Sequence, residues 1–144
     1  MEAIKVNDSK YFVRLDRGDR VNESLKRFCE ENDIACAKIS AIGALKDIEL
    51  GYYDYDNDLY DKKLFNEEYE LLSMEGNVSI LKENTFVHLH ISMSDSKYQV
   101  FGGHLFDATV AVTVECWLEP FDASFVRMMA GKESFMPIGF KASK

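Results

Sequence analysis

Apolar and polar residues alternate with a period of two over most of this chain, and they follow helical spacing in one early segment. The apolar positions of that segment share one helix face and are Val21, Leu25, Phe28 and Cys29. They predict an amphipathic helix that runs to about Asn32, with Asp19 placed to cap its N-terminus. A strand over residues 11–15 is expected to precede this helix.

Nearly everything after the helix has the pattern of β-strands separated by turn residues. We expect Gly43 to turn the chain after a strand over 35–42, and Gly76 to lie in a turn between two further strands. Pro120 should end the last long strand. The expected strands are 35–42, one containing Ile48, Leu50 and Tyr52, 69–74, 78–81, 86–93, 98–105, 109–118 and a final hairpin of 125–127 with 135–140 around Gly131.

Runs of strands with one helix near the N-terminus favour the α+β class over alternating β-α-β units. The predicted architecture is a largely antiparallel β-sheet packed with the N-terminal amphipathic helix. Because 144 residues suffice for one hydrophobic core, we expect a single compact domain over 1–144 with its core at about 10–120.

The charge and the cysteine content of the chain indicate which partners and which cellular compartment to expect. The chain has 25 acidic and 17 basic residues and a net charge of -8, whereas nucleic-acid modules are usually basic. No signal peptide pattern and no apolar run of about 20 residues is present, so we expect no membrane segment. Three cysteines, an odd number without paired spacing, indicate reduced thiols in a cytoplasmic protein.

The most informative local pattern is the clustering of all three histidines within one predicted hairpin. In segment 86–94 the alternate apolar residues Val87, Leu89, Ile91 and Met93 define the core face of the strand. His88 and His90 therefore project side by side from the opposite face, and His104 follows Gly102-Gly103 in the next strand. Imidazole is the commonest transition-metal ligand, and three histidines with an open position suit a zinc-type ion. The alternative is that His88 and His90 are surface residues and His104 is a hydrogen-bonded one.

Several segments together resemble the PPC (plants and prokaryotes conserved) domain. They are Phe86–Ser94, Gly102-Gly103-His104-Leu105, Thr113-Val114-Glu115, Arg14-Leu15 before Gly18-Asp19, Ile42-Gly43-Ala44 and Glu70-Leu71-Leu72-Ser73-Met74-Glu75-Gly76. The resemblance covers nearly the whole chain and implies a compact α+β domain that assembles as a homotrimer. It also implies that His88, His90 and His104 hold a metal, zinc or a similar divalent transition ion.

Plant relatives of this family carry AT-hook DNA-binding segments, and single-domain prokaryotic relatives are customarily labelled DNA-binding. No Arg-Gly-Arg-Pro arm is present here, and the longest basic run is Lys62-Lys63. Direct DNA binding is therefore doubtful for this chain. The tail after Pro120 matches the family loosely, and we place no functional residue there.

Other polar residues are weighed as neighbours of the histidines. Glu115 interrupts an apolar strand; it is a candidate to orient a metal-bound water or a histidine, or its face is simply wetted. Ser92 and Asp107 are further candidates for this supporting role. Arg14 is a candidate contact for an anionic ligand or another subunit, although a surface ion pair explains it equally simply. The Asp54-Asp56-Asp58 spacing fails as a calcium loop, because Leu59 and Phe65 occupy positions that need Gly and Glu.

Two functions remain open from the sequence. One is a homotrimeric metal-binding module, regulatory or DNA-binding by family label, that takes a small anionic ligand or a partner at the three-histidine site. The other is a metal-dependent hydrolase or lyase at the same site, with Glu115 or Asp107 as its base. A carboxylate in a concave pocket within reach of the metal-bound water would favour the enzyme.

Overall fold

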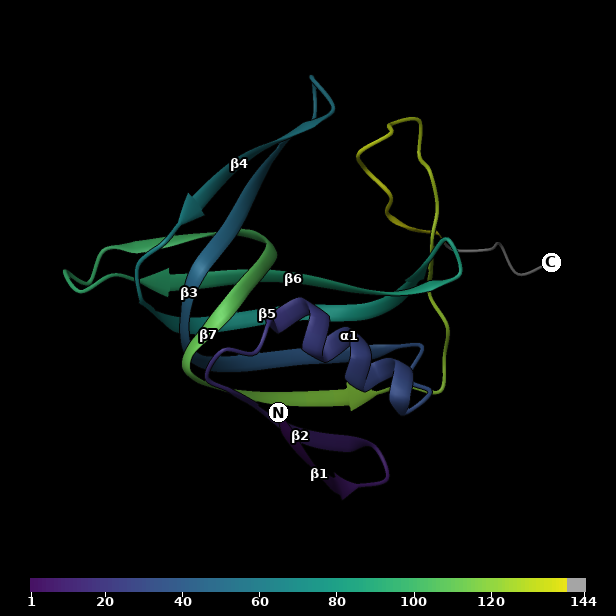
Figure 1. The fold of residues 1–144 in the computed structure, drawn as a ribbon. Helices are drawn as coiled ribbons and strands as arrows, with labels where there is room; N and C mark the ends of the chain where they lie inside the picture. The colour runs from purple at the N-terminus through teal and green to yellow at the C-terminus, as the bar shows by residue number, and fades with distance from the viewer. Residues whose placement is uncertain (140–144) are drawn as a thin grey trace.

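The computed structural model describes residues 1–139 as one strand-rich domain with a single helix, α1 (Figure 1). The helix comprises Val21–Glu31. The strands are β1 (Glu2–Asn7), β2 (Lys10–Asp16), β3 (Ala37–Asp54), β4 (Leu59–Phe65), β5 (Tyr69–Leu81), β6 (Asn84–Ser94), β7 (Val100–Pro120), β8 (Val126–Arg127) and β9 (Ile138–Gly139).

The strands form one sheet whose pairings close on themselves. β3 pairs with β5, β5 with β6, β6 with β7, and β7 again with β3, all antiparallel. The two long strands make this closure feasible because the β3–β7 register shifts between Gly43 and Leu45 and again before Glu49, which bends both strands. β8 adds a short parallel pair to β5.

The hydrophobic core fills the inside of this closed sheet and the space beneath the helix. The four apolar residues predicted for the helix face are all buried, and so are the alternate residues 87, 89, 91 and 93 of β6. α1 packs against β6 and β7 (Figure 1). The period-two and helical patterns therefore placed the core correctly, because burial of one face is what produces them.

The fold is more β than the predicted α+β class, since its one helix has 11 residues. Two strands were not predicted, because neither carries a core pattern: the six residues of β1 are all exposed, and β4 is exposed over most of its length. Three continuous strands were each predicted as two shorter ones. Gly43 has an extended φ of 159° within β3, and Gly76 lies inside the continuous strand β5. Similarly, β7 runs unbroken through both strands expected over 98–118, to Pro120.

The predicted tail hairpin is present as the antiparallel pair β8–β9, in which Val126 faces Gly139; Phe140, at its predicted end, lies outside the described residues. The start of α1 differs from prediction. Arg20 occupies the N-cap position without a side-chain cap, while the Asp19 carboxylate accepts a hydrogen bond from the Asp16 backbone N–H at 2.9 Å.

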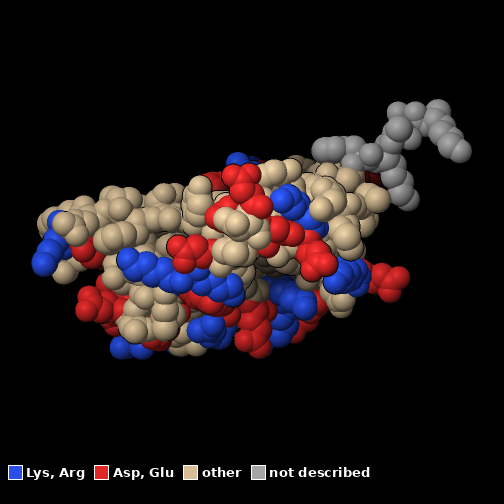
Figure 2. Space-filling model, turned by 90° about the horizontal axis from the view of Figure 1, so that it is seen from above, with Lys and Arg blue, Asp and Glu red and all other residues tan. Residues whose placement is uncertain are grey.

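Charges are distributed without a dominant sign over the surface that Figure 2 presents, where Lys and Arg side chains are interspersed with Asp and Glu. Of the residues described, no helix is both long and apolar enough to cross a membrane.

Candidate metal centre

The three histidines meet on neighbouring strands, on the side of β6 that faces away from the core. His90 lies opposite His104 across the β6–β7 ladder, and His88 lies two residues earlier on the same face of β6. The ring centroids are 5.0 Å apart for His88 and His104, 5.1 Å for His88 and His90, and 5.3 Å for His90 and His104. The predicted convergence of the three rings is therefore present.

Two glycines allow the strands to approach closely at these histidines. A Cβ on Gly76 would lie 2.0 Å from the backbone carbonyl oxygen of His88, and one on Gly103 would lie 3.0 Å from that of Gly51. Side chains at these positions would push β5 away from β6 and β7 away from β3. Gly103, directly before His104, thus serves close packing of β7 against β3.

The donor set fits a transition-metal ion. One ring nitrogen from each histidine can be chosen so that all three lie within 4.8 Å of one another. A tetrahedral ion with bonds of about 2.0–2.1 Å needs nitrogens about 3.4 Å apart, which modest side-chain rotation can supply. The Nδ1 atom of His104 is buried and has no hydrogen-bond partner among the described residues. A buried ring nitrogen without a partner is costly unless something else binds it.

The surroundings keep two of the rings neutral. Burial, helped by the positive charge of Arg127 and the neighbouring histidines, lowers the pKa of His88 to about 4. Burial and the His90 and Arg127 charges likewise lower the pKa of His104 to about 4. Both rings are therefore uncharged at neutral pH, and the uncharged ring is the form that binds a metal.

Arg127 on β8 borders the histidines, although it was not among the candidate residues predicted from the sequence. Its Nη2 lies 3.0 Å from His88 Nδ1 and donates to Asn77 Oδ1 at 3.1 Å. Its Nε donates to Ser79 Oγ at 2.9 Å, and its Nη1 donates to the Met136 carbonyl oxygen at 3.1 Å. Burial of this side chain lowers its pKa. Arg127 is 39 residues from His88, so no local spacing pointed to this contact.

A cavity of about 220 Å³ opens beside His88 and His104. Together with the two histidines, Arg127 and Ser134 form part of its wall. The rest of the wall consists of the apolar and aromatic side chains of Tyr60, Leu81, Phe86, Phe106, Phe135 and Met136. No acidic side chain is among the described residues that line it. The segment after Pro120 supplies four of the lining residues, so the tail in which no functional residue was expected completes this cavity.

The other candidate residues lie elsewhere. Asp107 forms an ion pair with Arg20 at 2.9 Å and accepts hydrogen bonds from the backbone N–H groups of Asn22 and Ala108. Arg14 forms surface ion pairs with Glu2 at 3.0 Å and Asp16 at 2.8 Å. Neither residue lines the histidine cavity.

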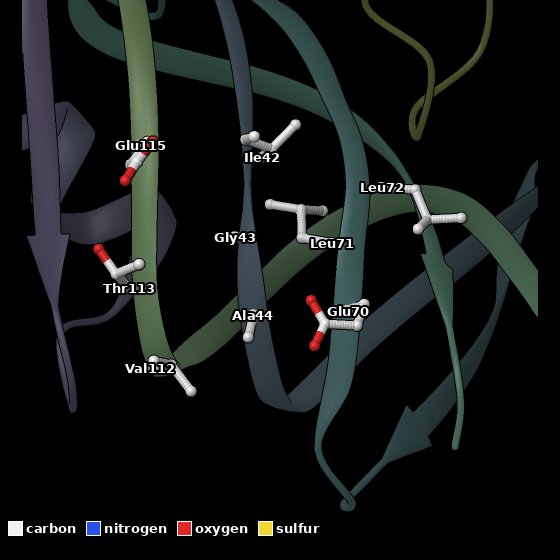
Figure 3. Close-up of a pocket in the computed structure, with 9 residues that line it drawn as sticks. All are labelled: Ile42, Gly43, Ala44, Glu70, Leu71, Leu72, Val112, Thr113 and Glu115. Carbon is white, nitrogen blue, oxygen red and sulfur yellow. The ribbon is translucent and has the colours of Figure 1, made fainter. Parts of the chain in front are cut away.

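Glu115 is exposed on β7, opposite Arg14 on β2 and Ile42 on β3. It belongs to a second, open depression of about 450 Å³, and Figure 3 shows it there with Thr113 on the same strand. Ser92 lies across from Gly102 and Ser73, on the histidine side of β6. Its hydroxyl does not line the cavity.

Fold and site together define a small domain with a closed antiparallel sheet and a three-histidine cluster beside a lined cavity. Residues 4–122 match the sequence profile of the Plants and Prokaryotes Conserved (PCC) domain. The chain belongs to this family, as its sequence motifs indicated. The match ends before β8, so Arg127 lies beyond it.

Solved structures of similar proteins share the whole fold. A plant- and prokaryote-conserved protein of Pyrococcus horikoshii is 27% identical with a TM-score of 0.84, covering 99% of this chain and 96% of its own. A protein of Bacteroides thetaiotaomicron, named as a suspected DNA-binding protein, is 27% identical with a TM-score of 0.91, covering 96% of both chains. A metal-containing protein of Archaeoglobus fulgidus is 33% identical with a TM-score of 0.84, covering 95% of this chain and 100% of its own.

A curated relative is the bifunctional protein GlmU of a Synechococcus strain, 30% identical over 96 residues. The matched segment is 66% of this chain and 14% of that protein's length.

Proposed function

We propose that this protein is a metal-binding module in which His88, His90 and His104 hold a zinc-like ion. The observation that carries the proposal is the convergence of the three rings, with the His104 Nδ1 atom buried and without a partner. The metal-containing relative from Archaeoglobus fulgidus supports it. Bound there, the ion would supply a Lewis-acidic centre beside the cavity that His88 and His104 line.

A binding role is favoured over hydrolase or lyase chemistry. The enzyme hypothesis needs a carboxylate within hydrogen-bond reach of a metal-bound water. Of the two proposed bases, Asp107 is engaged by Arg20 and the start of α1, and Glu115 lies at the other depression. The described lining of the histidine cavity contains no Asp or Glu. The cavity suits an anionic ligand better than a general base.

Metal content per chain tests the site. Protein made without a histidine tag is equilibrated with zinc, freed of excess ion, and measured by plasma mass spectrometry. We expect about one zinc per chain for the wild type and almost none for His90→Ala. A site with three protein ligands loses most of its affinity for the metal when one ligand is removed. Thr85→Ala, also on β6, is the matched control and should keep its zinc. A wild-type protein that binds no zinc would overturn the proposal.

The second part of the proposal is a homotrimer, the assembly that the family resemblance implies. The surface around the open depression supports it, because it exposes a group of apolar side chains on three adjacent strands. Ile42 is 56%, Leu72 47% and Val112 63% exposed there (Figure 3). In the proposed trimer, other copies of this chain cover this face, because an exposed apolar patch of this kind is costly in water.

Light scattering after size exclusion tests the assembly. The wild type should have a mass of about three times the 16.5 kDa chain. Val112→Asp should fall to the monomer mass, because it buries a charge in the proposed interface. Val100→Asp is the matched control, since Val100 lies on the same strand, is 62% exposed and does not line the depression. A wild-type monomer, or a trimer unaffected by Val112→Asp, would contradict this interface.

A further inference from the structure

Arg127 is a half-buried positive charge whose partners in the described structure are all neutral. Its four hydrogen bonds go to Ser79, Asn77, His88 and the Met136 carbonyl oxygen. Within residues 1–139, none of its contacts is an ion pair with an acidic group. A guanidinium has five N–H donors, so one N–H of Nη1 has no partner there. Because a buried charge is stabilised by a counter-charge, this position favours an anion in the adjoining cavity.

Metal binding would release a second donor of Arg127. A neutral imidazole has one lone-pair nitrogen, and the Arg127–His88 hydrogen bond requires that lone pair on His88 Nδ1. If a metal binds Nδ1, it displaces Arg127. If it binds the other ring nitrogen, the proton resides on Nδ1, which then can no longer accept a hydrogen bond. In both cases an N–H of Nη2 loses its acceptor, and the charge near Arg127 becomes more positive.

The cavity walls indicate the rest of the ligand. Aromatic rings of Phe86, Phe106 and Phe135 surround it, and its volume of about 220 Å³ is below the roughly 300–1,000 Å³ of sites for drug-sized molecules. Such walls contact an apolar or planar body and provide little for a second charged group. The nearby cation Lys62 is held by Glu49 at 3.1 Å and lies over the Phe106 ring. Arg127 is therefore the one cationic side chain that lines the described cavity.

We propose that this cavity binds a small organic monocarboxylate with an apolar body, which Arg127 holds through two N–H donors when a metal occupies the histidines. The inference rests on the metal site proposed above and assigns its ligand class. Two parallel N–H···O bonds to a carboxylate are a strong and geometrically selective arrangement. Metal and anion binding are consequently coupled, and each raises the affinity for the other by the same factor.

Calorimetric titration with benzoate tests the ligand class, on wild-type protein with and without zinc. Benzoate carries a carboxylate on a ring of suitable size, and benzamide is its neutral counterpart. We expect the zinc-loaded protein to bind benzoate at least about tenfold more tightly than the zinc-free protein, since one charge-assisted hydrogen bond is worth that much. Benzamide and acetate should bind weakly, and benzoate should tighten zinc binding by the same factor.

Variants identify the residue responsible. Arg127→Met should weaken benzoate binding to the zinc-loaded protein by at least about tenfold, and Arg127→Lys should weaken it less, because Lys keeps the charge but not the paired donors. Arg14→Met makes the same change at a surface arginine and should have no effect. Zinc content is measured for every variant, which separates loss of the anion site from loss of the metal site.

The outcomes separate the two proposals. A wild type that binds no zinc overturns the proposed function itself. A wild type that binds zinc but holds benzoate no more tightly than benzamide overturns only the carboxylate site. Equal benzoate affinity in the wild type and Arg127→Met would do the same, as would displacement by inorganic phosphate in preference to benzoate.

Discussion

Asp107 is three residues from His104, yet its contacts show a structural role at the start of α1. Its Oδ1 atom accepts hydrogen bonds from the Asn22 and Ala108 backbone N–H groups, at 3.1 and 2.8 Å. Its Oδ2 atom pairs with Arg20, the N-cap residue, which provides no cap of its own. The first N–H groups of a helix have no partners within the helix. Asp107 therefore supplies from β7 the cap that Asp19 was expected to provide.

Asp107→Ala is thus expected to lower the free energy of unfolding by about 0.5–2 kcal/mol, the range typical of lost N-caps. Zinc content should remain that of the wild type. Urea unfolding at equilibrium measures the first quantity and plasma mass spectrometry the second. The exposed Asp122 provides the control Asp122→Ala, which should change stability little. Unchanged stability together with lost zinc would contradict the capping role and restore Asp107 as a neighbour of the metal.

At the scale of single residues, the sequence predicted what depends on local spacing. His88 and His90 were placed on one strand face because side chains alternate along a strand. Gly76 was predicted to lie in a turn. A glycine that allows two strands to approach closely looks the same in the sequence as a glycine in a turn. Arg127 was missed because it lies 39 residues after His88 in the sequence, and only the folded chain brings the two side chains into contact.

Among the elements, the C-terminal segment is fastened at the tip of the β3–β4 hairpin, towards which it runs in Figure 1. The Asp58 carboxylate accepts hydrogen bonds from the backbone N–H groups of Glu133 at 2.7 Å and Ser134 at 3.1 Å. The Phe135 ring stacks on Tyr53 with centroids 5.7 Å apart. Because residues 134–136 line the histidine cavity, the acidic hairpin positions one of its walls.

Protonating Asp58 should loosen this segment. The hydrogen bonds from Tyr53 and from the two backbone N–H groups, with the nearby Lys132 charge, hold the pKa of Asp58 below its usual value of 3.8. A lowered carboxylate pKa means that the stabilisation is complete at neutral pH and is lost as the pH falls through that lowered value. Asp58→Asn should reproduce the loosening at pH 7.

Amide hydrogen exchange measures it, with faster exchange expected at Glu133 and Ser134 in Asp58→Asn. Asp56→Asn, two residues away in the same acidic loop, is the matched control because the Asp56 side chain accepts none of the hydrogen bonds described for the loop. Exchange rates that are equal in the wild type and Asp58→Asn would show that Asp58 does not fasten the segment.

Element boundaries were the least predictable feature of the fold. The helix and β6 agreed with prediction because each has a strong one-sided apolar pattern. β3 and β5 were each divided at a glycine, although sheet pairing continues through Gly43 and Gly76. A long strand that bends at a register shift differs little in sequence from two strands joined by a turn. The closure of the sheet depends on these bends, so it could not be predicted from local sequence patterns.

At the scale of the whole molecule, the charge of -8 argues against direct contact with DNA. Duplex binding draws most of its energy from phosphate neutralisation by Lys and Arg on one face. In Figure 2 the basic side chains are interspersed with acidic ones. Even the longest basic run is partly neutralised, since Lys62 pairs with Glu49.

We therefore expect the protein to bind a short AT-rich duplex with a Kd weaker than about 10⁻⁴ M in about 50 mM salt, where electrostatic attraction is strong. Fluorescence anisotropy of the labelled duplex measures this affinity, with and without zinc, so that a metal-dependent contact would also be detected. A Kd in the micromolar range that weakens steeply with salt would contradict the expectation. Replacing Lys62 and Lys63 with Glu would then show whether this run makes the contact. If neither state binds, the DNA-binding label of the relatives does not extend to direct binding by this chain, which favours the histidine site as the place where the proposed function lies.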